Sequence, residues 1–509
     1  MADPLEDALE AVARSFARRE LNDDASVLAA LRARGLDLAH GSADVVRATI
    51  EKFWKVVHDD PNYALGLVTA AHVMALERGA SPLLRAELRH RRGTALFALG
   101  RAREAAVELE AGLQDVKEAE HPAPHPAADP LEIARTRAAL LGFLGNARIA
   151  LGDVTRACAA LEEALYIARK HGLKAAEGIY LSSLGNARTV AGEARAAAEY
   201  YEQALAIARQ VGNERGEAVN LGNLGLAKQA LGDLDGALEC YEGSLAIAEK
   251  LGDRRGAATD SANMGAVYHD MGELDEAEKR YFTAHQAANE LEDRKTEGNS
   301  LLGLAALARD RGQPTEAERV AREARALFGA LEDPKGVADA IAEEGRAAFD
   351  KGDLPSARSM GEKALEQARV LGDKRGEASA LYDIGRVLAL LGEKRPALAR
   401  LDEALAASRD IEDLEGEALA RIASAEVLAA LGDARAAKTA LEAASSRARA
   451  RGGSTLRVRF ELARASVARG QGQRDQAKKH LDAALALARD RGFVGLAREA
   501  EKRLASDAS

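Results

Sequence analysis

The sequence contains few of the residues on which disulfide-bonded, metal-binding and membrane-spanning proteins depend. Only two of the 509 residues are cysteines, and Cys158 and Cys240 lie too far apart to suggest a disulfide framework or a cysteine metal site. No apolar run approaches transmembrane length, and the acidic start MADPLEDALEAVARSF lacks the basic residues of a signal peptide. These absences predict a cytoplasmic protein with no cofactor, no bound metal and no membrane partner.

The chain also lacks the positive charge of a nucleic-acid-binding protein. Its formal net charge is −10 and its pI is about 5.7, so no nucleic acid is expected among its partners. One region differs, because residues 447–469 hold seven arginines and a single acid, Glu461. Two interpretations remain open for this region, namely a solvated helix edge or a patch for a phosphate or an acidic partner.

Aromatic residues are scarce, at 4% of the chain, whereas alanine, leucine, charged residues and 45 glycines are abundant. The glycines recur with a period of 40 residues, and an alanine follows each of them five places later, which indicates a repeat array. The glycine column begins at Gly152, Gly192, Gly232 and Gly272, and the alanine column at Ala157, Ala197, Ala237 and Ala277.

Each 40-residue unit has the pattern of two helices joined by a short turn. In the unit 218–257 we expect helices at about 218–231 and 234–251, joined by the sequence LGD. Gly232 suits a left-handed residue after the first helix, and Asp233 suits the N-cap of the second. Gly225 lies inside the first helix, where we expect it to allow close approach to the alanine column at Ala237.

The repeat signature resembles that of the tetratricopeptide repeat (TPR). The first helices read LLGFLGNARIALGD (140–153), YLSSLGNARTVAGE (180–193) and NLGNLGLAKQALGD (220–233). The spacing is similar to that of the 40-residue subclass of Pins/LGN-type adaptors and kinesin light chains. The resemblance implies an all-α fold, a right-handed superhelix of about ten helix-turn-helix repeats, whose concave wall is formed by the first helix of each repeat.

The expected organisation divides the chain into five segments. Residues 1–82 form an N-terminal helical segment with a degenerate TPR-like pair, and 83–118 form a first TPR. A Pro- and His-rich insertion follows at 119–130, then nine contiguous repeats at 131–497. A C-terminal capping helix and tail are expected at 492–509, because the ends of a repeat array need a polar outer face.

The resemblance places the partner-binding residues on one face of the first helices. Asparagine can bond a peptide unit as donor and acceptor, and arginine can hold a carboxylate with two hydrogen bonds. A solvated helix face is the alternative, and Arg346 and Asp350 could also satisfy each other. The candidate residues are Asn146, Asn186, Gln229, His269, Asn299, Arg309, Arg346, Tyr382 and Arg386.

No catalytic constellation is visible in the sequence. It has no HExxH motif and no phosphate-binding glycine loop, so we expect the protein not to be an enzyme. The expected function is that of a scaffold or adaptor that binds a peptide segment of another protein on the concave surface. The alternative is a ligand- or peptide-responsive regulatory switch that controls an effector through the N-terminal segment. Whether the array self-associates is left open.

Overall fold

The chain forms 25 α-helices and no β-strand in the part that the computed structural model describes, which comprises residues 4–21, 23–33, 43–57, 59–121, 129–450 and 455–508. The predicted all-α TPR solenoid is therefore confirmed. Much of the predicted Pro-rich insertion, residues 122–128 with His125, lies outside the described residues, as does Arg451 of the arginine-rich region. None of the described helices offers a stretch that could span a lipid bilayer.

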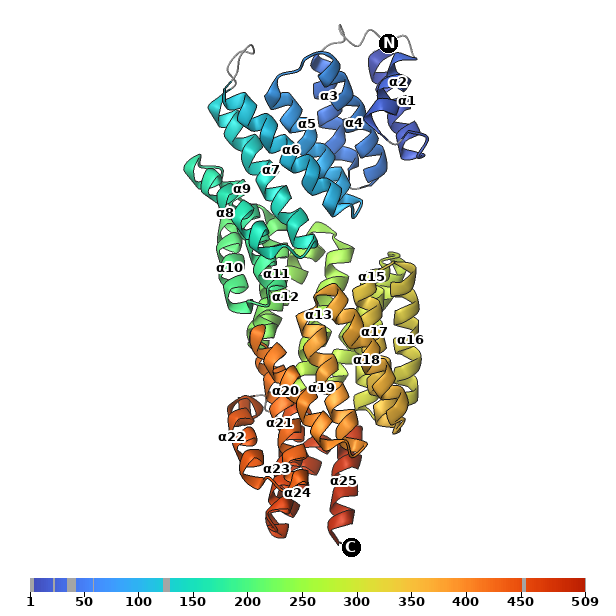
Figure 1. Ribbon diagram of the computed structural model, residues 1–509, viewed down its shortest axis with the longest axis vertical. Coiled ribbons are helices and arrows are strands. Elements are labelled where there is room, and N and C mark those ends of the chain that lie inside the picture. The colour runs from blue at the N-terminus through green and yellow to red at the C-terminus, as the bar shows by residue number, and fades with distance from the viewer. Residues whose placement is uncertain are drawn as a thin grey trace. The chain divides into compact units, whose positions relative to one another are not determined.

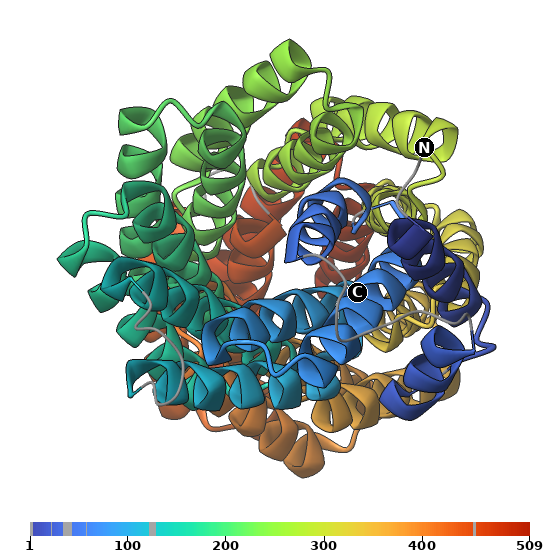
Figure 2. The same ribbon diagram turned by 90° about the horizontal axis from the view of Figure 1, so that it is seen from above.

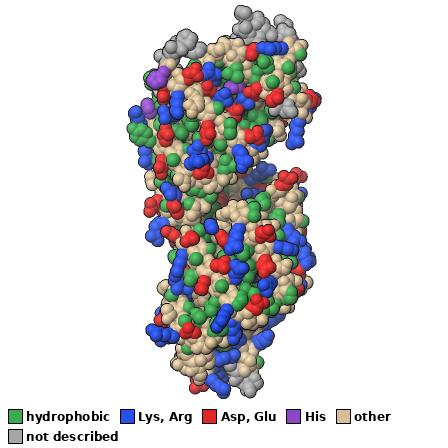
Figure 3. All heavy atoms as spheres, viewed as in Figure 1, with side chains coloured by type: hydrophobic (Ala, Val, Ile, Leu, Met, Phe, Trp, Pro, Cys, Tyr) green, Lys and Arg blue, Asp and Glu red, His purple; other side chains and the backbone are tan. Residues whose placement is uncertain are grey.

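The chain divides into two compact units, each described here by itself. The first comprises residues 1–191 and 199–212, and the second residues 192–198 and 213–509. From α5 onward (Figure 1), successive helices pack side by side as antiparallel pairs, whereas α1 packs mainly against α4. Acidic and basic side chains are interspersed over the face shown in Figure 3.

The helices of the first unit include four that precede the regular pairs. In α5, Ser81 caps the N-terminus and Pro82 occupies the first turn. The helix bounds are α1 Pro4–Ala17, α2 Asp24–Arg32, α3 Ala43–Val56, α4 Pro61–Glu77, α5 Pro82–Ala98, α6 Ala102–Glu120, α7 Pro130–Ala150, α8 Val154–Lys170, α9 Lys174–Val190 and, shared with the second unit, α10 Ala194–Gln210.

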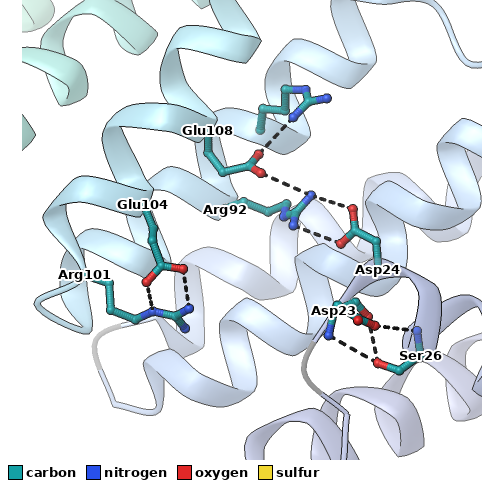
Figure 4. A network of polar contacts seen from close by, with 8 residues as sticks. Asp23, Asp24, Ser26, Arg92, Arg101, Glu104 and Glu108 are labelled. Atoms are coloured by element: carbon teal, nitrogen blue, oxygen red, sulfur yellow. Dashed lines mark hydrogen bonds and ion pairs between the residues drawn. The ribbon is translucent and has the colours of Figure 1, made fainter.

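An arginine network joins the N-terminal helices of the first unit to its first regular pair (Figure 4). Arg92 on α5 forms two hydrogen bonds to the Asp24 carboxylate at the start of α2, at 3.0 and 3.3 Å, and lies 3.6 Å from Glu108 on α6. The neighbouring residues Asp23 and Ser26 form a capping box. Arg92 therefore holds the start of α2 against α5 and α6.

The second unit consists mainly of the regular pairs. In each pair, the first helix carries an odd number and the second an even number. The bounds are α11 Glu214–Leu231, α12 Leu234–Leu251, α13 Arg254–Met271, α14 Leu274–Glu290, α15 Arg294–Asp310, α16 Pro314–Ala330, α17 Pro334–Lys351, α18 Leu354–Leu371, α19 Lys374–Leu390, α20 Lys394–Asp410, α21 Leu414–Leu431, α22 Ala434–Ala450, α23 Thr455–Gly470, α24 Arg474–Asp490 and the single α25 Val494–Ala508.

The turns confirm the local predictions. Gly232 ends α11 in the left-handed conformation, with φ 81°, and the Asp233 side chain accepts a hydrogen bond from the Gly236 N–H at the start of α12. At the joins between pairs, Glu292, Glu332 and Glu412 adopt φ 53° where other repeats have glycine. The 40-residue period therefore corresponds to one helix pair and its two turns.

The glycine inside the first helix packs closest to an aromatic ring of the second helix in several repeats. A Cβ on Gly225 would lie 2.8 Å from the Tyr241 ring, and one on Gly185 would lie 2.5 Å from the Tyr201 ring. The expected approach to the alanine column is seen in later repeats, where a Cβ on Gly385 would lie 3.4 Å from the Ala397 carbonyl oxygen. Residues 16 apart face each other across the pair, and the absent side chain makes room for a buried aromatic ring.

Candidate binding cavity of the second unit

The second unit encloses a cavity of about 750 Å³. Its wall is formed largely by the first helices α15, α17, α19, α21 and α23, and the C-terminal helix α25 closes another side. Figure 2 shows the green, yellow and orange helices of this unit along an arc. The volume falls within the range of small-molecule and peptide pockets.

The cavity combines apolar surface with an excess of positive charge. Phe349 and Leu390 contribute apolar groups, and the Leu390 side chain is 63% exposed. Among the described residues that line the cavity, eight are basic and only four are acidic. The basic residues are Arg309, Arg386, Lys394, Arg459, Arg469, Arg498, Lys502 and Arg503, and the acidic ones are Asp310, Asp350, Glu426 and Glu499.

Arg386 is held in the cavity by aromatic rings rather than by carboxylates. Its guanidinium lies 4.3 Å from the centroid of the Phe349 ring and 5.7 Å from that of the Tyr382 ring. Arg459 on α23 lines the same cavity and is half-buried. Within the described chain, neither Arg386 nor Arg459 forms a hydrogen bond or a direct ion pair, so their N–H groups remain available to a ligand.

A ladder of polar pairs joins the first helices of consecutive repeats. Gln229 donates a hydrogen bond to Asp270 at 2.8 Å, and His269 Nε2 lies 2.9 Å from Asp310 Oδ2. Arg309 continues the ladder 3.6 Å from Asp350. In each step the twelfth residue of one repeat meets the thirteenth of the next, so the ladder follows from the 40-residue period.

Neighbouring cations lower the pKa values of Asp310 and Glu343 in this wall, whereas burial raises the pKa of Asp350. Burial alone would raise the pKa of Glu343. The charges of Arg309 and Arg346 lower it by more than burial raises it, so the pKa lies below its usual value. Arg346 donates hydrogen bonds to Asp383 at 2.8 Å and to Glu343 at 3.1 Å. The alternative in which Arg346 and Asp350 satisfy each other is not observed, because Arg346 points toward α19.

Helix α25 contributes a second set of contacts. Arg503 donates to Glu426 on α21 at 2.7 Å and to the Ser466 hydroxyl on α23 at 2.9 Å. It also bonds Glu499 one turn earlier on α25, and Arg498 donates to the Gly312 carbonyl at 3.4 Å. Helix α25, which the sequence predicts as a capping helix, therefore forms part of the cavity wall.

The nine candidate residues occupy different surroundings. Arg309 and Arg386 line the cavity, Tyr382 lies beside Arg386, and Arg346 lies in the wall behind it. Gln229 and His269 belong to the ladder, and Asn299 on α15 is exposed. Asn146 and Asn186 belong to the first unit, where Asn186 accepts a hydrogen bond from Tyr201 at 2.8 Å.

Sequence reasoning did not select Arg459, Glu426, Glu499 or Arg503 as site residues. A signal was present for Arg459, because it lies in the arginine-rich region 447–469. The residues of α25 gave no such signal, because nothing in the sequence of this helix indicates that it lines the cavity. No group of acidic, histidine or cysteine side chains suited to hold a metal occurs in the part of the chain that the structure describes.

Comparison with known proteins agrees with this architecture. The model of the MalT-like TPR region matches residues 214–497, more than half of the chain. Two general tetratricopeptide repeat models match residues 181–215 and 138–171. No curated protein matches the chain significantly in sequence.

RapI shares the fold at low sequence identity, and two further solved structures are similar with lower scores. The apo form of RapI is 13% identical, with a TM-score of 0.53 over 72% of this chain and 98% of that one. The quorum sensor NprR from B. thuringiensis is 12% identical, with a TM-score of 0.49 over 73% and 98%. A kinesin light chain of Podosopora anserina with nearly identical TPR-like repeats is 23% identical, with a TM-score of 0.32 over 41% and 96%.

The chain belongs to the MalT-like TPR region family, on the strength of the match that extends over most of its second unit.

Proposed function

We propose that the protein is a non-enzymatic adaptor that binds a peptide segment of a partner protein in the cavity of the second unit. The observation that carries this proposal is the cavity itself, which the first helices of consecutive repeats and α25 enclose together. Stacked repeats provide extended concave surfaces of this kind for binding.

The lining suits a polypeptide segment. Leu390 and the Phe349 ring can bury an apolar side chain, and the free N–H groups of Arg386 and Arg459 can bond carbonyl or carboxylate oxygens. Neighbouring cations lower the pKa values of Asp310 and Glu343, so these two carboxylates suit ion pairing rather than general-base catalysis. Burial raises the pKa of the third carboxyl, Asp350, which lies 3.6 Å from Arg309.

A random peptide library displayed on phage tests the proposal. Wild-type protein should select peptides that an Ala430→Trp variant does not bind, because Ala430 is an exposed residue of the cavity wall that the larger side chain would fill. The matched control is Ala399→Trp on α20, an exposed position that does not line the cavity. Selected peptides that bind both variants equally would remove the cavity as the site.

The regulatory switch is the second candidate, and one observation favours it. Helix α25 contacts both α15 and α23, so a ligand that displaces α25 would release contacts between repeats far apart in sequence. Small-angle scattering of the protein with and without a selected peptide separates the two candidates. A change in the radius of gyration supports the switch, and an unchanged radius supports a rigid adaptor.

A further inference from the structure

We propose that Arg386 and Arg459 form a carboxylate-binding subsite, so that the cavity of the second unit selects an acidic peptide segment. This inference rests on the proposed peptide-binding function and names the chemistry of the ligand. It concerns two guanidinium groups on helices α19 and α23 that line one cavity.

Three arginines in or beside the wall, unlike Arg386 and Arg459, have carboxylate partners, and Arg498 donates to a backbone carbonyl instead. Arg309 bonds Glu343 at 2.9 Å, and Arg346 bonds Asp383. Arg503 bonds Glu426 on a different helix. A guanidinium has five N–H donors, and a carboxylate accepts two of them in a planar fork. Arg386 and Arg459 line the cavity, and neither donates a hydrogen bond to a carboxylate in the described part of the chain.

Arg386 is oriented by aromatic rings, without a directly bonded counter-ion. The Phe349 ring supports one face of its guanidinium, and the Tyr382 ring lies nearby. Stacking on a ring occupies the face of the guanidinium but leaves the N–H groups at its edge free to donate in the plane. The aromatic pair therefore orients Arg386 while its hydrogen-bonding edge remains available.

The cavity lining around Arg386 and Arg459 has an excess of positive charge. The charges of Asp350 and Glu499 act on this part of the cavity, but Asp350 lies 3.6 Å from Arg309 and Glu499 is paired with Arg503. The lining retains an excess of basic side chains in a protein whose net charge is −10. An acidic segment would neutralise this excess, whereas a basic segment would add to it.

A purely structural role for the two arginines is the competing explanation. In that case Arg386 and Arg459 would only balance Asp350 and Glu499 at longer range, and their removal would weaken the fold without changing ligand preference. Peptide preference therefore decides between the two explanations, and stability alone does not.

Calorimetric titration of the full-length protein with three peptides tests the subsite. The probes are acetyl-EELEE-amide, acetyl-QQLQQ-amide and acetyl-KKLKK-amide, which share a central leucine and differ in charge. We expect wild-type protein to bind the acidic probe at least about 10-fold more tightly than the glutamine probe, with an affinity that falls as salt rises.

Variants then assign the preference to the two arginines. Arg386→Gln and Arg459→Gln should each lower the affinity for the acidic probe by roughly 10-fold and leave that for the glutamine probe nearly unchanged. The matched control is Arg395→Gln on α20, an exposed arginine that does not line the cavity. If Arg459→Gln does not fold, Arg386→Gln alone decides, because its side chain makes no hydrogen bond within the described chain.

The outcomes separate this inference from the function on which it rests. Equal binding of the acidic and glutamine probes, or an acidic preference that survives both substitutions, overturns the subsite. If phage-selected peptides lack acidic residues but are still lost in Ala430→Trp, the cavity binds peptides and only the carboxylate subsite fails. If Ala430→Trp retains every selected peptide, the cavity function fails first.

Discussion

His269 and Asp310 form a half-buried pair that links two consecutive repeats of the second unit, with His269 Nε2 at 2.9 Å from Asp310 Oδ2. Burial alone would lower the pKa of His269. The hydrogen bond and the charge of Asp310 raise it by more than burial lowers it, so the pKa lies above its ordinary value of 6.5. For Asp310 the directions are reversed. Burial alone would raise its pKa, but Arg309 and His269 lower it below the ordinary value of 3.8.

The pair makes stability depend on pH with a defined sign. Its histidine contribution is complete below pH 6.5 and is lost as the pH rises through the raised pKa of folded His269. Its aspartate contribution is complete above pH 3.8 and is lost as the pH falls through the lowered pKa of Asp310. NMR titration of labelled histidines should give His269 a pKa above 6.5, and Asp310→Asn should bring it down. A wild-type pKa at or below 6.5 would contradict the pairing.

Gly225 and Tyr241 should be sensitive to a single added methyl group. Gly225→Ala places a Cβ 2.8 Å from the buried Tyr241 ring, so we expect a loss of roughly 1–3 kcal/mol in spite of the better helix propensity of alanine. The control is Gly329→Ala on α16, where nothing lies within 4 Å and the propensity gain of about 0.5–1 kcal/mol should appear alone. Urea denaturation measures both, and equal shifts in the midpoint would disprove the close contact.

The local structure of the repeats could be predicted from the sequence because its causes are local. The turn at Gly232 and the cap at Asp233 depend on residues within one turn of each other, and the 40-residue period repeats them. The register of the two helices decides that the Tyr241 ring lies nearest to Gly225, and this register depends on how whole side chains interlock.

The candidate site could be predicted only in part. Arg309 and Arg386 were on the correct face, because helical spacing determines which residues share a face. Arg459 and Arg503 could not be placed in the same cavity, since the curvature of a solenoid is the sum of small rotations between neighbouring repeats. The partners of Arg346 were also inaccessible to spacing arguments, because they depend on which rotamer each long side chain adopts.

Glutamate at the joins between repeats should cost stability. Glu332 and Glu412 adopt φ 53°, a conformation that is unfavourable by about 1–2 kcal/mol for a residue with a Cβ. Glu332→Gly should therefore raise stability by roughly 1 kcal/mol in urea denaturation. The converse control is Gly372→Ala at the equivalent join, where φ is 67° and no atom lies within 4 Å of the added Cβ, so any loss reflects the backbone alone. A destabilised Glu332→Gly would show that this glutamate makes a contact worth more than its strain.

Arg503 should control how firmly α25 is held in the second unit. Its half-buried guanidinium donates hydrogen bonds to Glu426, Glu499 and the Ser466 hydroxyl. Burial alone would lower the pKa of Arg503, but the charges of Glu426 and Glu499 raise it. We expect Arg503→Ala to increase amide hydrogen exchange of α25 by roughly 10-fold or more, because Glu426 then lies in the cavity wall without its cation.

An exposed ion pair between α24 and α25 provides the control for the Arg503 prediction. Arg489 on α24 bonds Glu501 on α25 at 2.6 Å, but both side chains are largely in solvent. Because exposed pairs contribute about 0–1 kcal/mol, Arg489→Ala should change the exchange of α25 by no more than a few-fold. Equal exchange in the two variants would show that α25 is held by its apolar contacts to α24 rather than by the charged groups that face the cavity.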